Sequence, residues 1–174
     1  MMSTPFQIVI DCQDPELMAR FWAAALGYVL EPSPEGFATW DDWRRDTGLP
    51  DSYLGMGPDS IVDPGGDGPR FWFRADEAAK VVKNRLHFDI HVSGGRTVIE
   101  GRSVPLPTRK QRVDAEAGRL ADLGATITGP LGDGVNHYAM GMKDPEGNEF
   151  DINLTRRAAG PGSSGWRVRQ ARTW

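Results

Sequence analysis

Near its start the chain reads Phe6-Gln7-Ile8-Val9-Ile10-Asp11-Cys12, and further along it reads Leu86-His87-Phe88-Asp89-Ile90-His91-Val92. Apolar residues occupy every second position in both stretches, which is the period of a half-buried strand. An amphipathic run follows each stretch and ends in a leucine and a glycine, at Leu26-Gly27 and at Leu123-Gly124. The repeat predicts one domain built from two similar units, each made of a strand and a helix.

The polar faces of the two predicted strands form a candidate site. They carry Gln7 and Asp11 in the first strand, and His87, Asp89 and His91 in the second. The opposite faces are apolar and are expected to be buried: Phe6, Ile8, Ile10 and Cys12 in the first strand, and Leu86, Phe88, Ile90 and Val92 in the second. A fold made of two such units can place the polar faces opposite each other in one cleft.

The composition is typical of a single domain with a small partner. The chain has 174 residues, of which 39% are hydrophobic, and this is enough for one well-buried core. Its formal net charge of -4 argues against a nucleic-acid-binding protein, which needs a basic surface to displace counterions. A small-molecule ligand is therefore the expected partner.

The N-terminal residues and the cysteine content predict a cellular compartment. The start, Met1-Met2-Ser3-Thr4-Pro5, has no basic segment followed by a long apolar core, and no later run is long enough to span a bilayer. The single cysteine, Cys12, cannot form an intramolecular disulfide, and its place on an apolar strand face predicts a small buried residue. We expect a cytoplasmic protein with no membrane partner.

Local signals fill in the first unit. Asp14-Pro15-Glu16 predicts the start of a helix, and Gly27 predicts its end. The segment 29–68 is rich in Pro, Gly and Asp, which predicts short strands joined by irregular loops. Arg70 to Arg74 contains three consecutive aromatic residues and is predicted to be the strand that closes this unit.

The second unit is longer than the first because of an insertion between Ser93 and about Arg109, for which we expect an exposed loop that can cover a cleft. Its helix shows an apolar stripe at Val113, Ala117, Leu120 and Leu123. Strands are predicted at 136–143 and 149–154, joined by the tight turn Asp144-Pro145-Glu146-Gly147-Asn148.

These elements predict a domain at 5–157, with module one at about 5–75 and module two at about 86–155. The remaining residues, 158–174, are rich in Gly, Pro and Ser and then basic, and we expect a flexible tail.

Three signatures together resemble the vicinal oxygen chelate superfamily, and above all its glyoxalase-like domains. They are Ile10-Asp11-Cys12-Gln13-Asp14-Pro15, Lys83-Asn84-Arg85-Leu86-His87-Phe88-Asp89 and Lys143-Asp144-Pro145-Glu146-Gly147-Asn148-Glu149-Phe150. The superfamily includes glyoxalase I, bleomycin-resistance proteins and extradiol dioxygenases. The resemblance implies an α+β fold in which two tandem βαβββ modules form a U-shaped cleft. Members are often dimers, so the resemblance also implies a homodimer.

In the metal-dependent members of the superfamily, the ligands come from the first and last strands of both modules. Carried over by position, the resemblance implies that Gln7, His87 and Asp151 are metal ligands. The fourth position falls in the strand that closes the first unit, which has no carboxylate, imidazole or amide. Asp76 and Glu77 lie just past that strand and reach the site only if the strand register is shifted.

The sequence leaves two classes of function open. In the first, one divalent ion (Zn, Ni, Fe or Mn) chelates neighbouring oxygens of a small carbonyl compound, and a lyase or isomerase reaction follows with His91 or Glu149 as proton carrier. In the second, the cleft holds no metal and sequesters an aromatic metabolite or an antibiotic, as bleomycin-resistance proteins do. The expected ligand-binding residues are Trp40, Trp72, Asp89 and Tyr138.

Overall fold

The computed structural model describes residues 4–92, 98–99, 102–103, 105–132 and 138–154. Module one consists of β1 (Gln7–Cys12), α1 (Pro15–Leu26), β2 (Val29–Leu30), β3 (Ser60–Val62) and β4 (Arg70–Ala75). A short helix, α2 (Trp40–Asp46), and a 3-10 turn, η1 (Asp51–Tyr53), lie between β2 and β3. Module two consists of β5 (Asp89–Val92), α3 (Leu106–Asp122), β8 (Thr126–Leu131), β9 (Ala139–Lys143) and β10 (Glu149–Leu154), with β6 (Val98–Ile99) and β7 (Arg102–Ser103) between β5 and α3.

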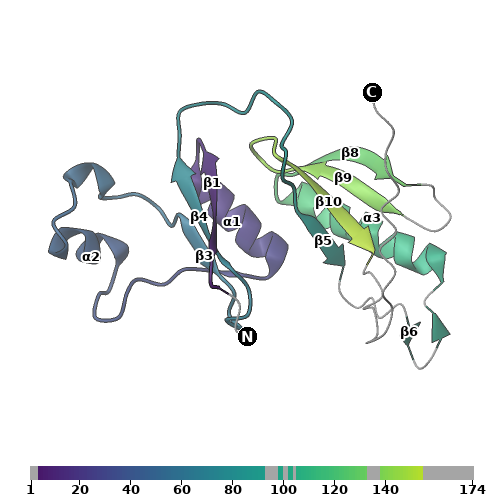
Figure 1. The fold of residues 1–174 in the computed structure, drawn as a ribbon, viewed down its shortest axis with the longest axis horizontal. Coiled ribbons are helices and arrows are strands. Elements are labelled where there is room, and N and C mark those ends of the chain that lie inside the picture. Colours follow the sequence, from purple (N-terminus) through teal and green to yellow (C-terminus); the bar gives the residue numbers. More distant parts are fainter. Residues whose placement is uncertain (1–3, 93–97, 100–101, 104, 133–137, 155–174) are drawn as a thin grey trace.

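The two modules have the same topology, which confirms the duplication predicted from the sequence. The first four-stranded sheet has the order β1-β4-β3-β2, and the second has the order β5-β10-β9-β8. In each sheet the first strand of the module runs parallel to the last strand, and the other neighbours are antiparallel. This is the predicted α+β architecture of tandem βαβββ modules (Figure 1).

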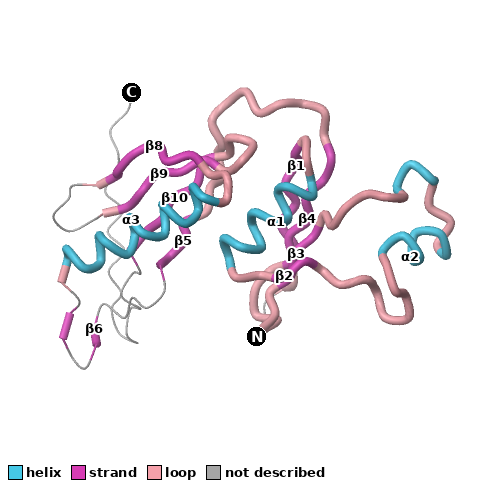
Figure 2. Tube along the Cα trace, turned by 180° about the vertical axis from the view of Figure 1, so that it is seen from behind, coloured by secondary structure: helices cyan, strands magenta, loops and turns pink. Residues whose placement is uncertain are grey.

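Helix α1 connects the two modules through an aromatic cluster. The helix lies between the two sheets, and α3 covers the second sheet (Figures 1 and 2). The ring of Trp22 in α1 lies 5.2 Å from that of Phe150 in β10 and 5.3 Å from that of Phe88. Its indole Nε1 donates a hydrogen bond to the buried carboxylate of Asp144. Helix α1 therefore belongs to the core of both modules.

The ends of α1 follow the predicted signals. The Asp14 side chain accepts a hydrogen bond from the backbone N–H of Leu17, and Gly27 adopts the left-handed conformation at φ 71° that ends the helix. Before the helix begins, the carboxylate of Glu146 accepts hydrogen bonds of 2.8 Å and 2.7 Å from the backbone N–H groups of Gln13 and Asp14. The turn of module two thus also holds the start of α1.

Three apolar positions were wrongly predicted as buried. Leu86 is 89% exposed, because the ladder with β10 begins at Asp89 and leaves residues 86–88 outside the strand. Phe6 is 70% exposed, because it precedes β1. Leu123 is 42% exposed, because α3 ends at Asp122. In each case the pattern of apolar residues extends beyond the end of the strand or helix, where the side chain has no neighbouring element to pack against.

Two segments differ from the predicted loops. The segment 29–68 contains α2, whose start is stabilised by a capping box between Thr39 and Asp42. Part of the predicted loop at 93–109 belongs to the β6–β7 ladder and to the first turn of α3, where Pro107 is tolerated. Residues 93–97, 100–101 and 104 of this insertion, and the predicted tail at 158–174, lie outside the described residues. Within the described part, no helix has the length and apolar character needed to cross a bilayer.

Candidate functional site

Module two brings together three side chains that can ligate a metal. A nitrogen of His87 and carboxylate oxygens of Asp89 and Asp151 all lie within 4.8 Å of one another. His87 and Asp89 are exposed and Asp151 is partly buried, so the cluster is open to solvent. Two of these residues, His87 and Asp151, are the ones that the resemblance implied as ligands.

The strand register explains this cluster. In the parallel ladder between β5 and β10, Asp89 pairs directly with Asp151, so their side chains lie on the same face of the sheet. His87 precedes Asp89 by two residues in the connection that leads into β5, and the backbone N–H of Asp151 donates to the carbonyl of Phe88 beside it. The polar residues that alternate in the sequence therefore place three potential metal ligands on one face of the sheet.

Glu149 fixes the connection that precedes His87. Its carboxylate accepts hydrogen bonds from the backbone N–H of Asn84 and from the ammonium of Lys80. The Asn84 hydrogen bond, followed by Lys80, lowers the pKa of Glu149 to about 2. Glu149 is therefore a paired carboxylate that ties β10 to the connection between the modules.

The corresponding position in module one is occupied by the guanidinium group of Arg70. Gln7 pairs with Arg70 in the ladder between β1 and β4, and Nη1 of Arg70 donates a hydrogen bond of 2.9 Å to Oε1 of Gln7. The same guanidinium forms an ion pair of 2.6 Å with Glu31 and a hydrogen bond to Ser60. The amide oxygen of Gln7 therefore already accepts a hydrogen bond from a positively charged group.

The strand register of module one keeps Asp76 and Glu77 away from this position. The β1–β4 ladder pairs Gln7 with Arg70 at one end and Cys12 with Ala75 at the other. Asp76 and Glu77 follow the end that carries Cys12, where the N–H of Asp76 donates to the Cys12 carbonyl. In this register neither carboxylate lies next to Gln7.

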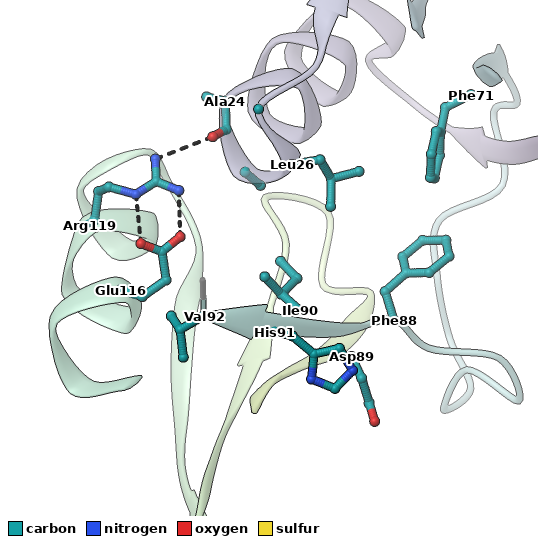
Figure 3. Close-up of a pocket in the computed structure, with 12 residues that line it drawn as sticks. Ala24, Leu26, Phe71, Phe88, Asp89, Ile90, His91, Val92, Glu116 and Arg119 are labelled. Atoms are coloured by element: carbon teal, nitrogen blue, oxygen red, sulfur yellow. Dashed lines mark hydrogen bonds and ion pairs between the residues drawn. The ribbon is translucent and has the colours of Figure 1, made fainter. Parts of the chain in front are cut away.

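A cavity of about 570 Å³ lies between the C-terminal end of α1 and the apolar face of β5 (Figure 3). Ile90 points toward Leu26 across this cavity, whereas the side chains of Asp89 and His91 extend from the opposite face of β5 (Figure 3). On one side Arg119 of α3 donates a hydrogen bond of 3.3 Å to the carbonyl of Ala24. The cavity is thus a gap between the modules, and Asp89 and His91 are among the residues that line it.

The predicted ligand-binding residues fall in different places. Trp40 and Trp72 line one pocket of about 490 Å³ between α2 and β4. Asp89 lies in the cluster of module two. Tyr138 is 7% exposed, and its hydroxyl bonds to Asp114 and Lys110 of α3. The structure therefore separates Tyr138 from the two tryptophans.

Two arrangements in the site were not foreseen from the sequence. The role of Arg70 as the partner of Gln7 requires the strand register, which no sequence pattern provides. The placement of Trp43 and Tyr53 in the pocket between α2 and β4 depends on a helix in the segment that was predicted as short strands and loops. The capping box at Thr39 and Asp42 is the one sequence signal that could have revealed it.

The donors of module two fit a divalent cation. One imidazole nitrogen and two carboxylate groups suit a borderline ion such as Zn, Fe, Mn or Ni, and a site with three protein ligands keeps positions open for substrate. The pair of Gln7 and Arg70 does not fit, because a guanidinium repels a cation. A metal would therefore be held by module two alone.

Comparisons with known proteins agree with this fold. Solved structures with a similar fold include the fosfomycin resistance protein FosX from Listeria monocytogenes, with a TM-score of 0.53 and 10% identity over 90% of this chain and 96% of that chain. Another is a glyoxalase/bleomycin resistance protein/dioxygenase family enzyme from Burkholderia phytofirmans, with a TM-score of 0.50 and 18% identity over 86% of this chain and 97% of that chain. No protein with a curated description matches the sequence.

A member of the glyoxalase/bleomycin resistance protein/dioxygenase superfamily from Sphaerobacter thermophilus is also similar, with a TM-score of 0.50 and 16% identity over 88% of this chain and 98% of that chain. At these identities the likeness establishes the fold. The family model of the glyoxalase-like domain matches residues 7–153, which include both modules. On this match, the chain belongs to the glyoxalase-like domain family.

Proposed function

We propose that this protein is a metal-dependent lyase or isomerase that acts on a small carbonyl compound. The observation that carries the proposal is the convergence of His87, Asp89 and Asp151, whose ligand atoms lie within 4.8 Å of one another. The cluster combines nitrogen and oxygen donors on the polar face of a sheet and is accessible to a small molecule.

Each residue of the cluster has a defined part in this proposal. His87, Asp89 and Asp151 would hold the cation, and two carboxylates would balance its charge. A divalent cation bound there supplies Lewis acidity toward the oxygens of a carbonyl compound. The paired carboxylate of Glu149 keeps the connection before His87 in place, so that the imidazole stays close to the two aspartates.

His91 is the proposed proton carrier. It follows Asp89 by two residues in β5, so its side chain lies on the same strand face as the cluster. An imidazole can take a proton from a carbon next to a carbonyl and return it to a neighbouring atom. Glu149 is the other residue expected to carry protons. Its carboxylate already accepts hydrogen bonds from Lys80 and from the backbone N–H of Asn84, so we assign it a positioning role.

Elemental analysis by plasma mass spectrometry tests the proposal. The protein purified without chelator should contain close to one equivalent of a divalent metal, and His87→Ala and Asp151→Asn should each lose it. Asp122→Asn, at the exposed end of α3, removes a carboxylate outside the cluster and should retain the metal. Circular dichroism establishes that each variant is folded. Metal retained by both cluster variants, or no metal taken up by the native protein on titration, would contradict the proposal.

The position of Arg70 in module one favours a second function. Because Arg70 occupies the position opposite Gln7, half of the ligand set that the superfamily uses is unsuited to metal. The second candidate is therefore a metal-free binding protein that sequesters an aromatic metabolite or an antibiotic. The two functions differ in their response to chelator, which abolishes the reaction of a metal-dependent enzyme and leaves metal-free ligand binding unchanged.

A further inference from the structure

The pocket between α2 and β4 is lined by five aromatic residues, the fully buried Phe73 and four that keep some exposure. It has a volume of about 490 Å³, within the range of small-molecule sites. Trp40 and Trp43 come from α2, Tyr53 comes from η1, and Trp72 comes from β4. In both views α2 lies on the side of the first sheet that is turned away from the second sheet (Figures 1 and 2). The pocket is thus separate from the cluster of module two.

The α2 segment is held in a defined conformation by its own polar contacts. The carboxylate of Asp41 accepts a hydrogen bond of 2.9 Å from the backbone N–H of Gly55 and one of 2.8 Å from Arg44. Arg44 is 6% exposed and also donates to the carbonyl of Met56. These bonds join the helix to the chain that returns toward β3, so the wall of the pocket is formed before a ligand arrives.

The aromatic side chains offer ring surface to a ligand. The indole N–H of Trp40 donates to the carbonyl of Glu31, and that of Trp72 donates to the carboxylate of Asp59. Trp40 and Trp43 are arranged edge to face with their ring centres 5.5 Å apart. Because both of these N–H groups are already bonded, Trp40 and Trp72 can contribute stacking and apolar contact, which suits a planar ring.

Arginines supply most of the charged side chains that line the pocket, and each of them is paired with a carboxylate. Arg44, Arg70 and Arg74 line it together with a single carboxylate, that of Asp59. Arg44 and Arg70 are shielded and hold several protein partners. Arg74 differs, because its ion pair is with Asp11, with Asp76 as a further acidic neighbour, and the side chains of Arg74 and Asp11 are 53% and 49% exposed. An exposed ion pair of this kind contributes little free energy, so Arg74 can exchange Asp11 for a carboxylate on a ligand.

We propose that the pocket between α2 and β4 binds a planar aromatic carboxylate, with the ring among Trp40, Trp43, Tyr53 and Trp72 and the carboxylate on Arg74. This inference rests on the second candidate function, metal-free binding of a small molecule, and places that molecule in the pocket between α2 and β4 instead of the cleft between the modules. It adds the chemical class of that ligand and a residue that determines specificity. Arg–carboxylate pairing can be bidentate, which gives direction as well as attraction.

Three probes with the same ring and different charge test the proposal: naphthalene-2-carboxylate, 2-naphthylmethanol and 2-naphthylmethylammonium. Calorimetric titration of the full chain should show the carboxylate binding about tenfold more tightly than the alcohol, and the ammonium binding most weakly. Arg74→Gln should reduce the preference for the carboxylate over the alcohol to less than about threefold. Tight binding of the ammonium, or equal binding of all three probes, would overturn the assignment of an anion.

Variants of the wall test the position of the ring. Trp43→Leu and Tyr53→Leu should each weaken binding of the carboxylate about fivefold or more, because each removes a ring from the pocket. Phe6→Leu removes an exposed aromatic ring outside the pocket and should bind as the native protein does. Unchanged affinity in both wall variants would place the ligand elsewhere. The titration is repeated with chelator and with His87→Ala, where unchanged affinity supports a site independent of the metal and loss of binding would assign the ligand to module two.

Discussion

Nη1 of Arg70 lies 2.9 Å from Oε1 of Gln7, so the amide oxygen that the superfamily pattern implies as a metal ligand is already the acceptor of a cationic donor. Arg70 is held in turn by Glu31, with Nη2 2.6 Å from the carboxylate. The two residues face each other in the β1–β4 ladder, and a metal ion close to Gln7 would be repelled by the guanidinium. The two modules are therefore similar in fold and different in the chemistry of their polar faces.

Substitution of Gln7 should leave metal binding intact. Because Oε1 of Gln7 already accepts a hydrogen bond from the Arg70 guanidinium, Gln7→Ala is expected to change the dissociation constant for Zn by less than about threefold. His87→Ala should weaken it by more than the roughly 10–100-fold that an outer-shell partner contributes. Competition with a fluorescent zinc chelator measures both constants. A large loss in Gln7→Ala would show that Gln7 turns away from Arg70 to join the metal.

Removal of the charge of Glu149 should loosen the connection between the modules. Glu149→Gln keeps the size of the side chain and weakens two charge-assisted bonds, those from the backbone N–H of Asn84 and from Lys80. We expect the free energy of unfolding to fall by about 1–2 kcal/mol, since the pair is partly screened by solvent. Urea unfolding at neutral pH measures this loss.

The matched control for Glu149 is Glu116→Gln. Glu116 also pairs with a cation, Arg119, but both lie on the same helix three residues apart. That pair should contribute about 0.5 kcal/mol or less. Equal losses in the two variants would mean that Glu149 contributes no more than a helical surface pair.

The indole N–H of Trp22 should stabilise the contact between α1 and module two. It donates to the carboxylate of Asp144, which is 2% exposed and whose pKa is raised because burial penalises its charge. Trp22→Phe removes this donor and leaves a small void beside Phe150, so we expect a loss of about 2–3 kcal/mol in the free energy of unfolding. Urea unfolding followed by far-ultraviolet circular dichroism measures it. Trp43→Phe in α2 serves as control and should stay within about 0.5 kcal/mol of the native protein; a similar midpoint for all three proteins would contradict the role of Trp22.

The sequence predicts the elements whose signals are local. The cap at Asp14, the stop at Gly27 and the alternation in β1 and β10 depend on residues that lie next to one another, and the structure confirms them. The end of an alternating run is less certain, because a strand ends where its neighbour ends. Leu86 illustrates this point: it continues the alternation, yet β10 provides no partner for it.

The candidate site was predictable only in part for the same reason. His87 and Asp151 follow from the alternation and the family signature, and the parallel pairing of Asp151 with Asp89 adds a third donor that the sequence had suggested for ligand binding. The bond between Gln7 and Arg70 joins residues far apart in the chain, and the aromatic pocket requires a helix of seven residues in a segment rich in loop-forming residues. Long-range register and short helices are the features that local patterns do not determine.

The single cysteine provides a test of the packing of β1 against its core. Cys12 is 2% exposed, and its pKa is raised from 9.0 to about 12 by burial and then by nearby carboxylates, Glu146 before Asp11. At pH 9 about half of the thiol is ionised in the unfolded chain, whereas a pKa of about 12 leaves roughly one part in a thousand ionised in the folded protein. Because the thiolate is the nucleophile, alkylation of the folded protein by iodoacetamide should be about 500-fold slower at pH 9 than in urea.

The raised pKa of Cys12 also predicts how its labelling and its contribution to folding stability depend on pH. A thiol whose pKa is raised in the folded state favours folding fully below pH 9.0, and this contribution is lost as the pH rises toward about 12. Labelling in urea should therefore rise with a midpoint near pH 9, while labelling of the folded protein should stay slow over the same range. Mass spectrometry of the intact chain follows the reaction, and all the label reports on Cys12 because the sequence has one cysteine. A folded protein that is labelled with a midpoint near pH 9 would show that Cys12 is accessible and that β1 does not pack against the core as described.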